Sequence, residues 1–479
     1  MAWIFGSKRA NNPDPVAVGL RVQSSMQGVA IPIGCGRARW SGNLIDYDGF
    51  TATPAKSPGA KGGLAGASGK GNTGQYNYTV SGIVSLGEGG ILAYNRIHNG
   101  SYIDFLIQPT AQELTDLSNI GINSQDITVG NNTYHAIYHY GNYTDGPDSW
   151  WSGAFPGQTP IAYPGQAYVI FPNIGLGSSP SFPSFSFDCT WSLSSDIPAL
   201  GPDANPADWI QAFLTNADWG VQGFPSSAIG DFATAKNYWR ATGMMVSVAL
   251  TAPTAAQSHL KDLIESLNAD FRWSNGNLDI VPYGDMAVSG NGYTYTPNTT
   301  PVYNLGVDDY LPNQGSLGNA ATGDKVMLAH SRADASQIPN IFQIEYLDRV
   351  NLYNPATIYQ SNDAQITSSG RRRYGDKKSQ HWFCLAGAAS QSVALQLHRA
   401  WTTLNTYQFT VGRQFILLDV LDIVTISEPA LQLSNQLVRI TEIQENSDGT
   451  LTMTAEEVPL TASAPVYFRQ KSKIGRAHV

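Results

Sequence analysis

The sequence lacks any long apolar run. No apolar stretch reaches the roughly 18 residues that a membrane-spanning helix requires. At the N-terminus, the basic pair Lys8-Arg9 follows only a very short apolar patch. A secretory signal has the reverse order, with positive charge first and a longer apolar core after it. We therefore expect neither a bilayer-spanning segment nor a secretory signal.

Cysteine is also scarce. The chain has 3 cysteines, which lie far apart at Cys35, Cys189 and Cys384. Because no Cys-x-x-Cys pair occurs, the spacing argues against a cysteine zinc site or a dithiol redox motif. The pattern predicts buried free thiols in a protein that folds in a reducing cytoplasm.

Charged residues are few, and acidic ones predominate. They make up 14% of the chain, and the formal net charge is −9. A soluble domain usually has about a quarter charged residues. Sequence-independent binding to DNA needs Lys and Arg to neutralise phosphates, so this balance argues against it. Ordinary solubility accounts for a modest net charge.

No convincing catalytic or metal-binding constellation occurs. His135 and His139 lie four residues apart, but no Glu follows His135 as a His-Glu-x-x-His motif demands. On a strand the two would lie roughly 13 Å apart, too far to share one metal. The carboxylates, among them Asp270, Asp279 and the pair Asp308-Asp309, are scattered. We therefore predict no metal, no cofactor and no enzymatic activity.

A glycine-rich stretch, residues 62–71 (GGLAGASGKG), invites comparison with a phosphate-binding loop. A Walker loop would need Gly in place of Leu64 and Ser or Thr in place of Gly71. It would also open a helix, whereas this stretch leads into an alternating strand. Nucleotide binding is therefore excluded here, and the stretch is a surface loop.

The periodicity of apolar residues predicts a mainly β protein with an α+β insertion. Short strands fill residues 16–194, and residues 129–143 alternate with Tyr134, Ala136, Tyr138 and Tyr140 on one face. The aromatic stretch 150–160 is interpreted as a packed loop or a subunit contact. Later elements are a helix after Asn205-Pro206, a helix over 255–268, a hairpin over 271–282, a strand over 340–348, a helix over 386–403 and an antiparallel β-barrel over 407–455.

These elements suggest a multidomain chain. We expect a β-rich region over residues 1–200, a small α+β domain over 201–320 and a C-terminal β-barrel domain over 321–473. Residues 474–479 (IGRAHV) match the translation of a widely used sequencing adapter. They are interpreted as an assembly artefact, and we expect the true gene to continue past Lys473.

Basic residues gather in two loops. One covers residues 61–74, and the other covers residues 371–378 and includes Lys377 and Lys378. A solvated loop is the simplest interpretation of each, and a contact with an acidic neighbouring subunit is the alternative. The candidate assembly residues are Lys61, Lys70, Arg371, Arg372 and Arg373.

Several stretches match one family pattern in order along the chain. They are residues 28–36 (GVAIPIGCG), 43–47 (NLIDY), 76–91 (YNYTVSGIVSLGEGGI), 167–171 (AYVIF), 181–187 (SFPSFSF), 205–210 (NPADWI), 340–348 (NIFQIEYLD), 437–443 (LVRITEI) and 449–451 (GTL). In these stretches the chain resembles the tail-tip or baseplate hub proteins of long-tailed phages and gene transfer agents. It departs from the pattern at Gly87 (usually Cys), Gly90 (usually Pro) and Leu421 (usually Gly), so the turn at Leu421 should be less tight.

The resemblance implies a structural hub with antiparallel β-barrel domains at the tail tip of a virion, assembled in the host bacterial cytoplasm. It implies a homotrimer that caps the tail tube and forms a channel for ejected DNA. An acidic channel wall would repel the DNA phosphates and let the DNA slide through. Implied partners are the distal tail or tube-end protein, the tape-measure protein, a central fibre and the host envelope. A tail-associated cell-wall hydrolase or carbohydrate-binding tip protein is the alternative.

Overall fold

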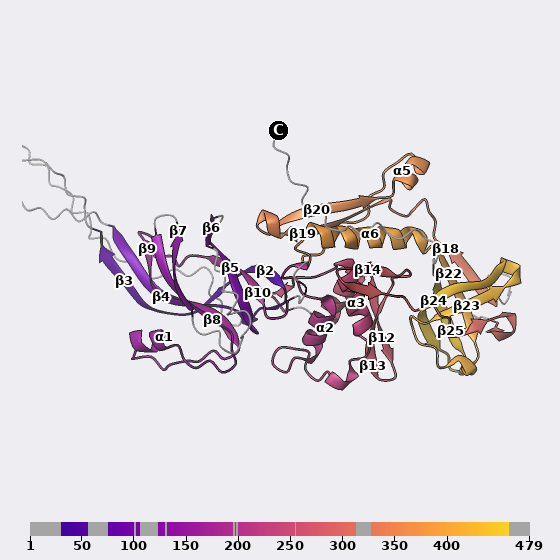
Figure 1. Ribbon diagram of the computed structural model, residues 1–479, viewed down its shortest axis with the longest axis horizontal. Helices are drawn as coiled ribbons and strands as arrows, with labels where there is room; N and C mark the ends of the chain where they lie inside the picture. Colours follow the sequence, from indigo (N-terminus) through magenta and orange to yellow (C-terminus); the bar gives the residue numbers. More distant parts are fainter. Residues whose placement is uncertain are drawn as a thin grey trace, which may run out of the picture. The chain divides into compact units, whose positions relative to one another are not determined.

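The computed structural model describes residues 30–55, 75–99, 102–105, 123–129, 132–194, 197, 200–253, 255–312 and 327–458 (Figure 1). These residues form two compact units. One comprises the described residues within 1–33 and 39–192, and the other those within 34–38 and 193–479. Lys61, Lys70 and the adapter-like residues 474–479 lie outside the described residues. No helix among the described residues is long and apolar enough to cross a membrane.

The first unit contains two β-sheets. The five-stranded sheet has the order β3 (Asn43–Pro54), β4 (Tyr76–Glu88), β9 (Gln166–Gly177), β8 (Asn132–Tyr140), β7 (Asn123–Val129), with antiparallel neighbours throughout. The four-stranded sheet has the order β2 (Arg37–Ser41), β10 (Phe185–Trp191), β5 (Ile91–Asn99), β6 (Tyr102–Phe105).

Aromatic side chains join these two sheets. Phe171 of β9 stacks on Phe185 of β10 with ring centroids 4.6 Å apart, and Tyr94 of β5 lies 4.9 Å from Tyr138 of β8. Gly82 of β4 makes room for this core, since a Cβ there would lie 2.7 Å from the Phe182 ring. The unit is therefore held by large rings packed between the sheets.

The predicted alternation over residues 129–143 is confirmed in β8, where Ala136, Tyr138 and Tyr140 are buried on one face. On the opposite face Ile137 and His139 are buried too, and Trp151 of helix α1 (Ser149–Ala154) belongs to the same core cluster as Ile137. The prediction of a loop over residues 150–160 was therefore wrong at its start. Asp148 explains the helix, since its carboxylate accepts a hydrogen bond from the Trp151 backbone N–H at 2.7 Å.

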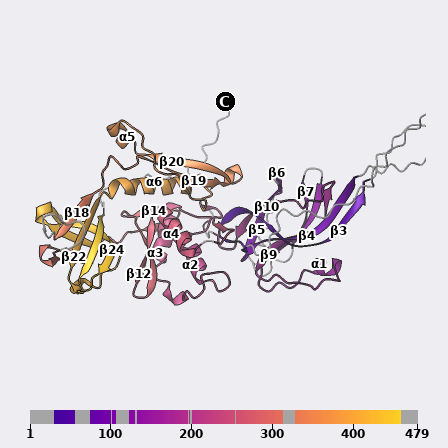
Figure 2. The same cartoon turned by 180° about the vertical axis from the view of Figure 1, so that it is seen from behind.

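The second unit begins with short helices and hairpins (Figure 2). Its elements are β1 (Ile33–Gly34, at the boundary between units), α2 (Pro206–Thr215), η3 (Ser226–Ala228), α3 (Ala233–Thr242), β11 (Ala249–Leu250), α4 (Ala256–Ser266), β12 (Ala269–Ser274), β13 (Asn277–Pro282), β14 (Val288–Gly290) and β15 (Tyr293–Tyr295). The predicted helix after Asn205-Pro206 is confirmed as α2, with Asn205 as its N-cap and Pro206 in its first turn. The predicted hairpin is confirmed as β12 and β13, joined at Asn275-Gly276.

A three-stranded sheet follows in the same unit. It has the order β20 (Asn354–Ser361), β19 (Ile341–Asp348), β21 (Lys378–Ser379), and helix α6 (Ala386–Thr402) lies along it. The predicted helix over residues 386–403 is thus confirmed. The connections contain η5 (Arg349–Asn351) and α5 (Asp363–Ser369).

The C-terminal region is a curled seven-stranded sheet. Its order is β16 (Asn304–Leu305), β23 (Ile423–Glu428), β24 (Leu433–Glu445), β25 (Leu451–Glu457), β22 (Asn405–Val411), β17 (Tyr310–Leu311), with β18 (Leu328–Arg332) also paired to β22. Short turns η4 (Val307–Asp309), η6 (Arg413–Phe415) and η7 (Pro429–Leu431) connect the strands. The core members that are fully inaccessible to solvent are Phe409, Val411, Val424, Ile426, Val438, Ile440, Met453 and Ala455.

The curling follows from the connectivity. The two edge strands β16 and β17 are joined by η4 alone, and the Tyr310 hydroxyl donates to the Leu305 carbonyl at 3.2 Å. The predicted barrel is confirmed as a curled sheet, with two differences. Strand β16 runs parallel to β23, and no ladder joins β16 to β17 among the described residues.

The turn at Leu421 has a left-handed residue and is closed by backbone hydrogen bonds. Leu421 has φ +71°, in the left-handed region that favours glycine. Its backbone N–H donates to the Ile440 carbonyl at 2.7 Å, and the Ile440 N–H donates to the Asp422 carbonyl at 2.9 Å. The turn is thus closed by two backbone hydrogen bonds, and the expectation that it is less tight than in the family stays a prediction.

Candidate functional site

The predicted basic segment follows helix α5, which ends at Gly370 in the left-handed region with φ +67°. The buried Asn340 fastens the segment, because its amide donates to the Arg371 carbonyl at 2.9 Å and accepts from the Arg373 N–H at 2.7 Å. The Arg373 guanidinium donates to the carbonyls of Ile338 and Ala335, both at 3.0 Å. Arg373 is therefore a structural residue of this loop.

The basic residues further along are paired within the chain. Lys377 lies 2.6 Å from Glu345, and Lys378 lies 2.6 Å from Glu265. Of the five cations in this cluster, Arg371 and Arg372 alone keep exposed side chains without a partner in the part of the chain that the structure describes. In the predicted cluster, Arg373, Lys377 and Lys378 therefore bind other groups of the chain, whereas Arg371 and Arg372 are free to contact a partner.

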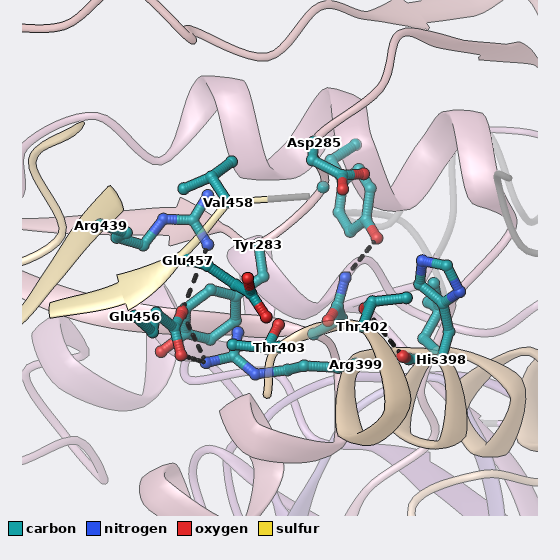
Figure 3. A pocket seen from close by; sticks show the side chains of 14 residues that line it. Tyr283, Asp285, His398, Arg399, Thr402, Thr403, Arg439, Glu456, Glu457 and Val458 are labelled. Atoms are coloured by element: carbon teal, nitrogen blue, oxygen red, sulfur yellow. Dashed lines mark hydrogen bonds and ion pairs between the residues drawn. The ribbon is translucent and has the colours of Figure 1, made fainter. Parts of the chain in front are cut away.

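A second polar site, which the sequence did not reveal, lies where α6, the barrel and the irregular segment after β13 meet (Figure 3). The Tyr283 ring lies between two guanidinium groups, with the Arg399 carbon 3.4 Å and the Arg439 carbon 5.0 Å from the ring centre. Arg399 donates to both carboxylate oxygens of Glu456, at 2.8 and 3.0 Å. The Tyr283 hydroxyl donates to Asp270 at 2.9 Å. We call Tyr283, Arg399, Arg439 and Glu456 the Tyr283 joint.

Burial determines the electrostatics of the Tyr283 joint. It lowers the pKa of Arg439, whose closest carboxylate oxygen, on Glu456, lies 3.8 Å away. It raises the pKa of Tyr283 against the opposing effect of Arg399. At the rim, burial raises the pKa of Asp285 and lowers the pKa of His398. Each of these shifts disfavours the charged form of its group.

The cavity beside the Tyr283 joint is too small for a substrate. Its volume is about 40 Å³, which is close to the space of a single water molecule. Known ligand pockets are roughly ten times larger. Perturbed pKa values in a cleft often mark a catalytic site. Because this cavity is so small, we interpret the Tyr283 joint as a structural contact between three chain segments.

A larger cavity, about 260 Å³, lies between the β12–β13 hairpin and the barrel. Arg272 crosses it, donating to Asp279 at 2.9 and 3.2 Å and to Asp422 at 3.2 Å. Asp279 also accepts from the Asp231 N–H at 2.7 Å. These carboxylates are satisfied by the protein itself, so the cluster fastens the hairpin to the barrel.

A largely buried arginine, with a side chain that is 11% exposed, clamps the start of the second unit. Arg349 donates to Asp203 and to the Arg37 carbonyl, the latter at 2.9 Å. Ser247 donates to the same carboxylate. Desolvation opposes the charge of Arg349, but the Asp203 carboxylate more than offsets it and raises the pKa of the guanidinium. The clamp joins three segments that are distant in sequence.

The remaining predicted candidates have structural surroundings. His135 is exposed, whereas His139 is buried, stacks on Tyr168 and lies 3.0 Å from Asp148. Asp270 accepts from Tyr283, and Asp279 accepts from Arg272. Among the described residues, no group of three or more His, Cys, Asp or Glu side chains is arranged to hold a metal ion.

Comparison with known protein families identifies a region that contains three of the four residues of the Tyr283 joint. Residues 255–443 match the family model described as "Putative phage tail protein". This region of the chain is therefore similar to phage tail proteins. The resemblance to phage tail proteins is thereby confirmed at this level. This region runs from α4 to the end of β24, so it contains Tyr283, Arg399 and Arg439 but not Glu456.

The fold is similar to that of a chain in a solved structure over most of its length. A chain in the structure "Virion of native gene transfer agent (GTA) particle" matches with a TM-score of 0.55 and 16% identity, covering 96% of this chain and 91% of that one. The 43 kDa tail protein of prophage MuSo2 from Shewanella oneidensis matches with a TM-score of 0.31 and 11% identity, covering 90% and 99%. The tail protein from Neisseria meningitidis MC58 matches with a TM-score of 0.32 and 8% identity, covering 89% of this chain and 99% of that one. No curated protein matches the chain.

Proposed function

We propose that this protein is a structural hub of a phage-type tail, located at the tail tip of a virion. The observation that carries the proposal is the fold that it shares, over nearly its whole length, with a chain of the gene transfer agent virion. The match to the phage tail protein family supports the same conclusion independently.

In this proposal the hub acts through shape and contacts and has no catalytic role. Three copies form a closed ring that caps the tail tube and surrounds the path of the ejected DNA. Partners are the tube-end protein, the tape-measure protein, a central fibre and the host envelope. The net charge of −9 would repel DNA phosphates from the ring.

The glycine-rich loop is part of this proposal as an assembly arm. Lys61 and Lys70 would contact acidic surfaces of a neighbouring subunit or another tail protein, and the glycines would allow close backbone approach. Deleting residues 62–71 and reconstituting tails tests this role. We expect that the deletion variant is not incorporated into tails. Normal incorporation of this variant would show that the loop has no assembly role.

Mass photometry and negative-stain electron microscopy of the full chain test the hub proposal. We expect particles of three times the chain mass of 51.6 kDa and images of a closed ring with threefold symmetry. A protein that stays monomeric at micromolar concentration would contradict the ring. Zymography on peptidoglycan tests the absence of catalysis, since a zone of clearing would show a cell-wall hydrolase instead.

A further inference from the structure

The larger cavity of the second unit, about 260 Å³ in volume, has one side that takes no part in fastening the hairpin to the barrel. This side is formed by residues 296–300 (TPNTT), which belong to the connection between β15 and β16. All five of these residues line the cavity. We call them the threonine strap.

The charged groups of this cavity nearly balance one another. Its lining contains three carboxylates and two guanidinium groups, which belong to Asp231, Asp279, Asp422, Arg272 and Arg439. Arg272 donates to both Asp279 and Asp422. An ion of either sign would meet like charges as well as opposite ones, so the cavity favours a neutral ligand.

One buried donor of the cavity lacks an acceptor. Arg439 is 7% exposed, and its Nε has no hydrogen-bond partner among the described residues. A buried donor without an acceptor lowers the stability of the folded state. An oxygen atom of a molecule bound in the cavity would satisfy it.

The threonine strap offers hydroxyl groups that can both donate and accept hydrogen bonds. Thr296 and Thr300 are exposed and Thr299 is half-buried, and no hydroxyl of the three has a partner in the part of the chain that the structure describes. The Asn298 side-chain oxygen accepts from the Thr300 N–H at 3.1 Å, which leaves the Asn298 amide hydrogens for a ligand. A ligand that also carries several hydroxyl groups would complement this side of the cavity.

The size of the cavity limits the ligand to one small ring. Its 260 Å³ is just below the roughly 300 Å³ at which known ligand pockets begin. It corresponds to the space of about eight or nine water molecules in the liquid. One sugar ring with its hydroxyl groups needs a space of this order.

We propose that this cavity binds one neutral sugar unit of a glycan. The threonine strap recognises the sugar hydroxyls, and Arg439 donates to a sugar oxygen. This inference rests on the proposed function for the source of the ligand, because a tail-tip protein meets the glycans of the host envelope. The site itself does not require the ring.

Titration of the full-length protein with N-acetylglucosamine, glucose and galactose, followed by saturation-transfer NMR, tests the site. Inorganic phosphate is the anionic probe. A ligand of this size should bind with a dissociation constant of about 1 mM. T299V/T300V keeps the shape of the strap and removes two hydroxyls, so it should bind the sugar roughly 10-fold more weakly. Thr251→Val, an exposed change outside this cavity, is the control and should bind as the unchanged protein does.

The outcomes separate this inference from the hub proposal. The site is wrong if no sugar binds at roughly ten times the expected dissociation constant, or if T299V/T300V is folded by circular dichroism and binds as well as the control. Phosphate binding without sugar binding overturns the neutral ligand. Mass photometry of the same samples reports on the ring: trimers that bind no sugar reject the site alone, and monomers that bind sugar reject the ring alone.

Discussion

Glu456→Gln should destabilise the second unit strongly, because Glu456 is the counterion of the Tyr283 joint. Its carboxylate accepts two hydrogen bonds from Arg399 and lies 3.8 Å from Arg439. The side chains of Glu456 and Arg439 are 14% and 8% exposed, so water cannot replace the lost charge. The change leaves a buried guanidinium without a counterion.

Removing one partner of a buried ion pair costs about 3–5 kcal/mol. Arg399 is 31% exposed and retains some hydration, so we expect the lower end, about 3 kcal/mol. A second change tests the physical cause. Adding Arg439→Met to Glu456→Gln should recover part of the loss, because the uncompensated charge then disappears.

Urea unfolding followed by hydrogen exchange of the β24 and β25 amides is the appropriate assay, since two compact units need not unfold in one step. Glu265→Gln is the matched control. Its partner Lys378 is 53% exposed and Glu265 itself 57%, so this surface pair should contribute at most about 1 kcal/mol. If Glu456→Gln costs no more than Glu265→Gln, the argument from burial is refuted.

Three further predictions concern single sites. Leu421→Gly should relieve about 1–2 kcal/mol of left-handed strain but lose about 1.5–3 kcal/mol of burial, so thermal unfolding should show a small net loss, and Leu421→Ala a larger one. The three cysteines are free and buried, so a maleimide should label none in the folded protein and all in urea, and labelling without urea would contradict their burial. Burial lowers the pKa of His259 to about 4, and its ring accepts a hydrogen bond from the Trp209 indole, so protonation favours the unfolded chain. The free energy of unfolding should fall by about 3 kcal/mol as the pH falls from 6.5 to 4. In His259→Gln this fall should be smaller by that amount. If the two proteins lose stability equally over this pH range, Glu and Asp residues cause the loss and the role of His259 is wrong.

Local signals predicted the elements that local physics determines. Asn205-Pro206 and Asn275-Gly276 place a helix start and a hairpin turn, because capping and positive φ depend on a few neighbouring residues. Helix α3 was not predicted, since its apolar positions are few. Its buried face is formed by Ala235, Tyr238, Trp239 and Ala241.

The Tyr283 joint was beyond prediction for a different reason. Its members come from the irregular segment after β13, from α6 and from two barrel strands, so no spacing in the sequence relates them. The basic segment shows the complementary limit. Its composition predicted a cluster, but only tertiary contacts distinguish Arg373, which binds backbone carbonyls, from Arg371 and Arg372, which remain available.

Leu421 shows how packing can support a residue other than glycine in a left-handed conformation. The left-handed region favours glycine, because a side chain is strained there. Leu421 nevertheless has φ +71°, and its backbone N–H donates to the Ile440 carbonyl. The side chain that causes the strain is 4% exposed, so its burial offsets the cost of the conformation. A substitution that looks disruptive in the pattern is therefore compensated by packing, which a pattern of residues alone does not record.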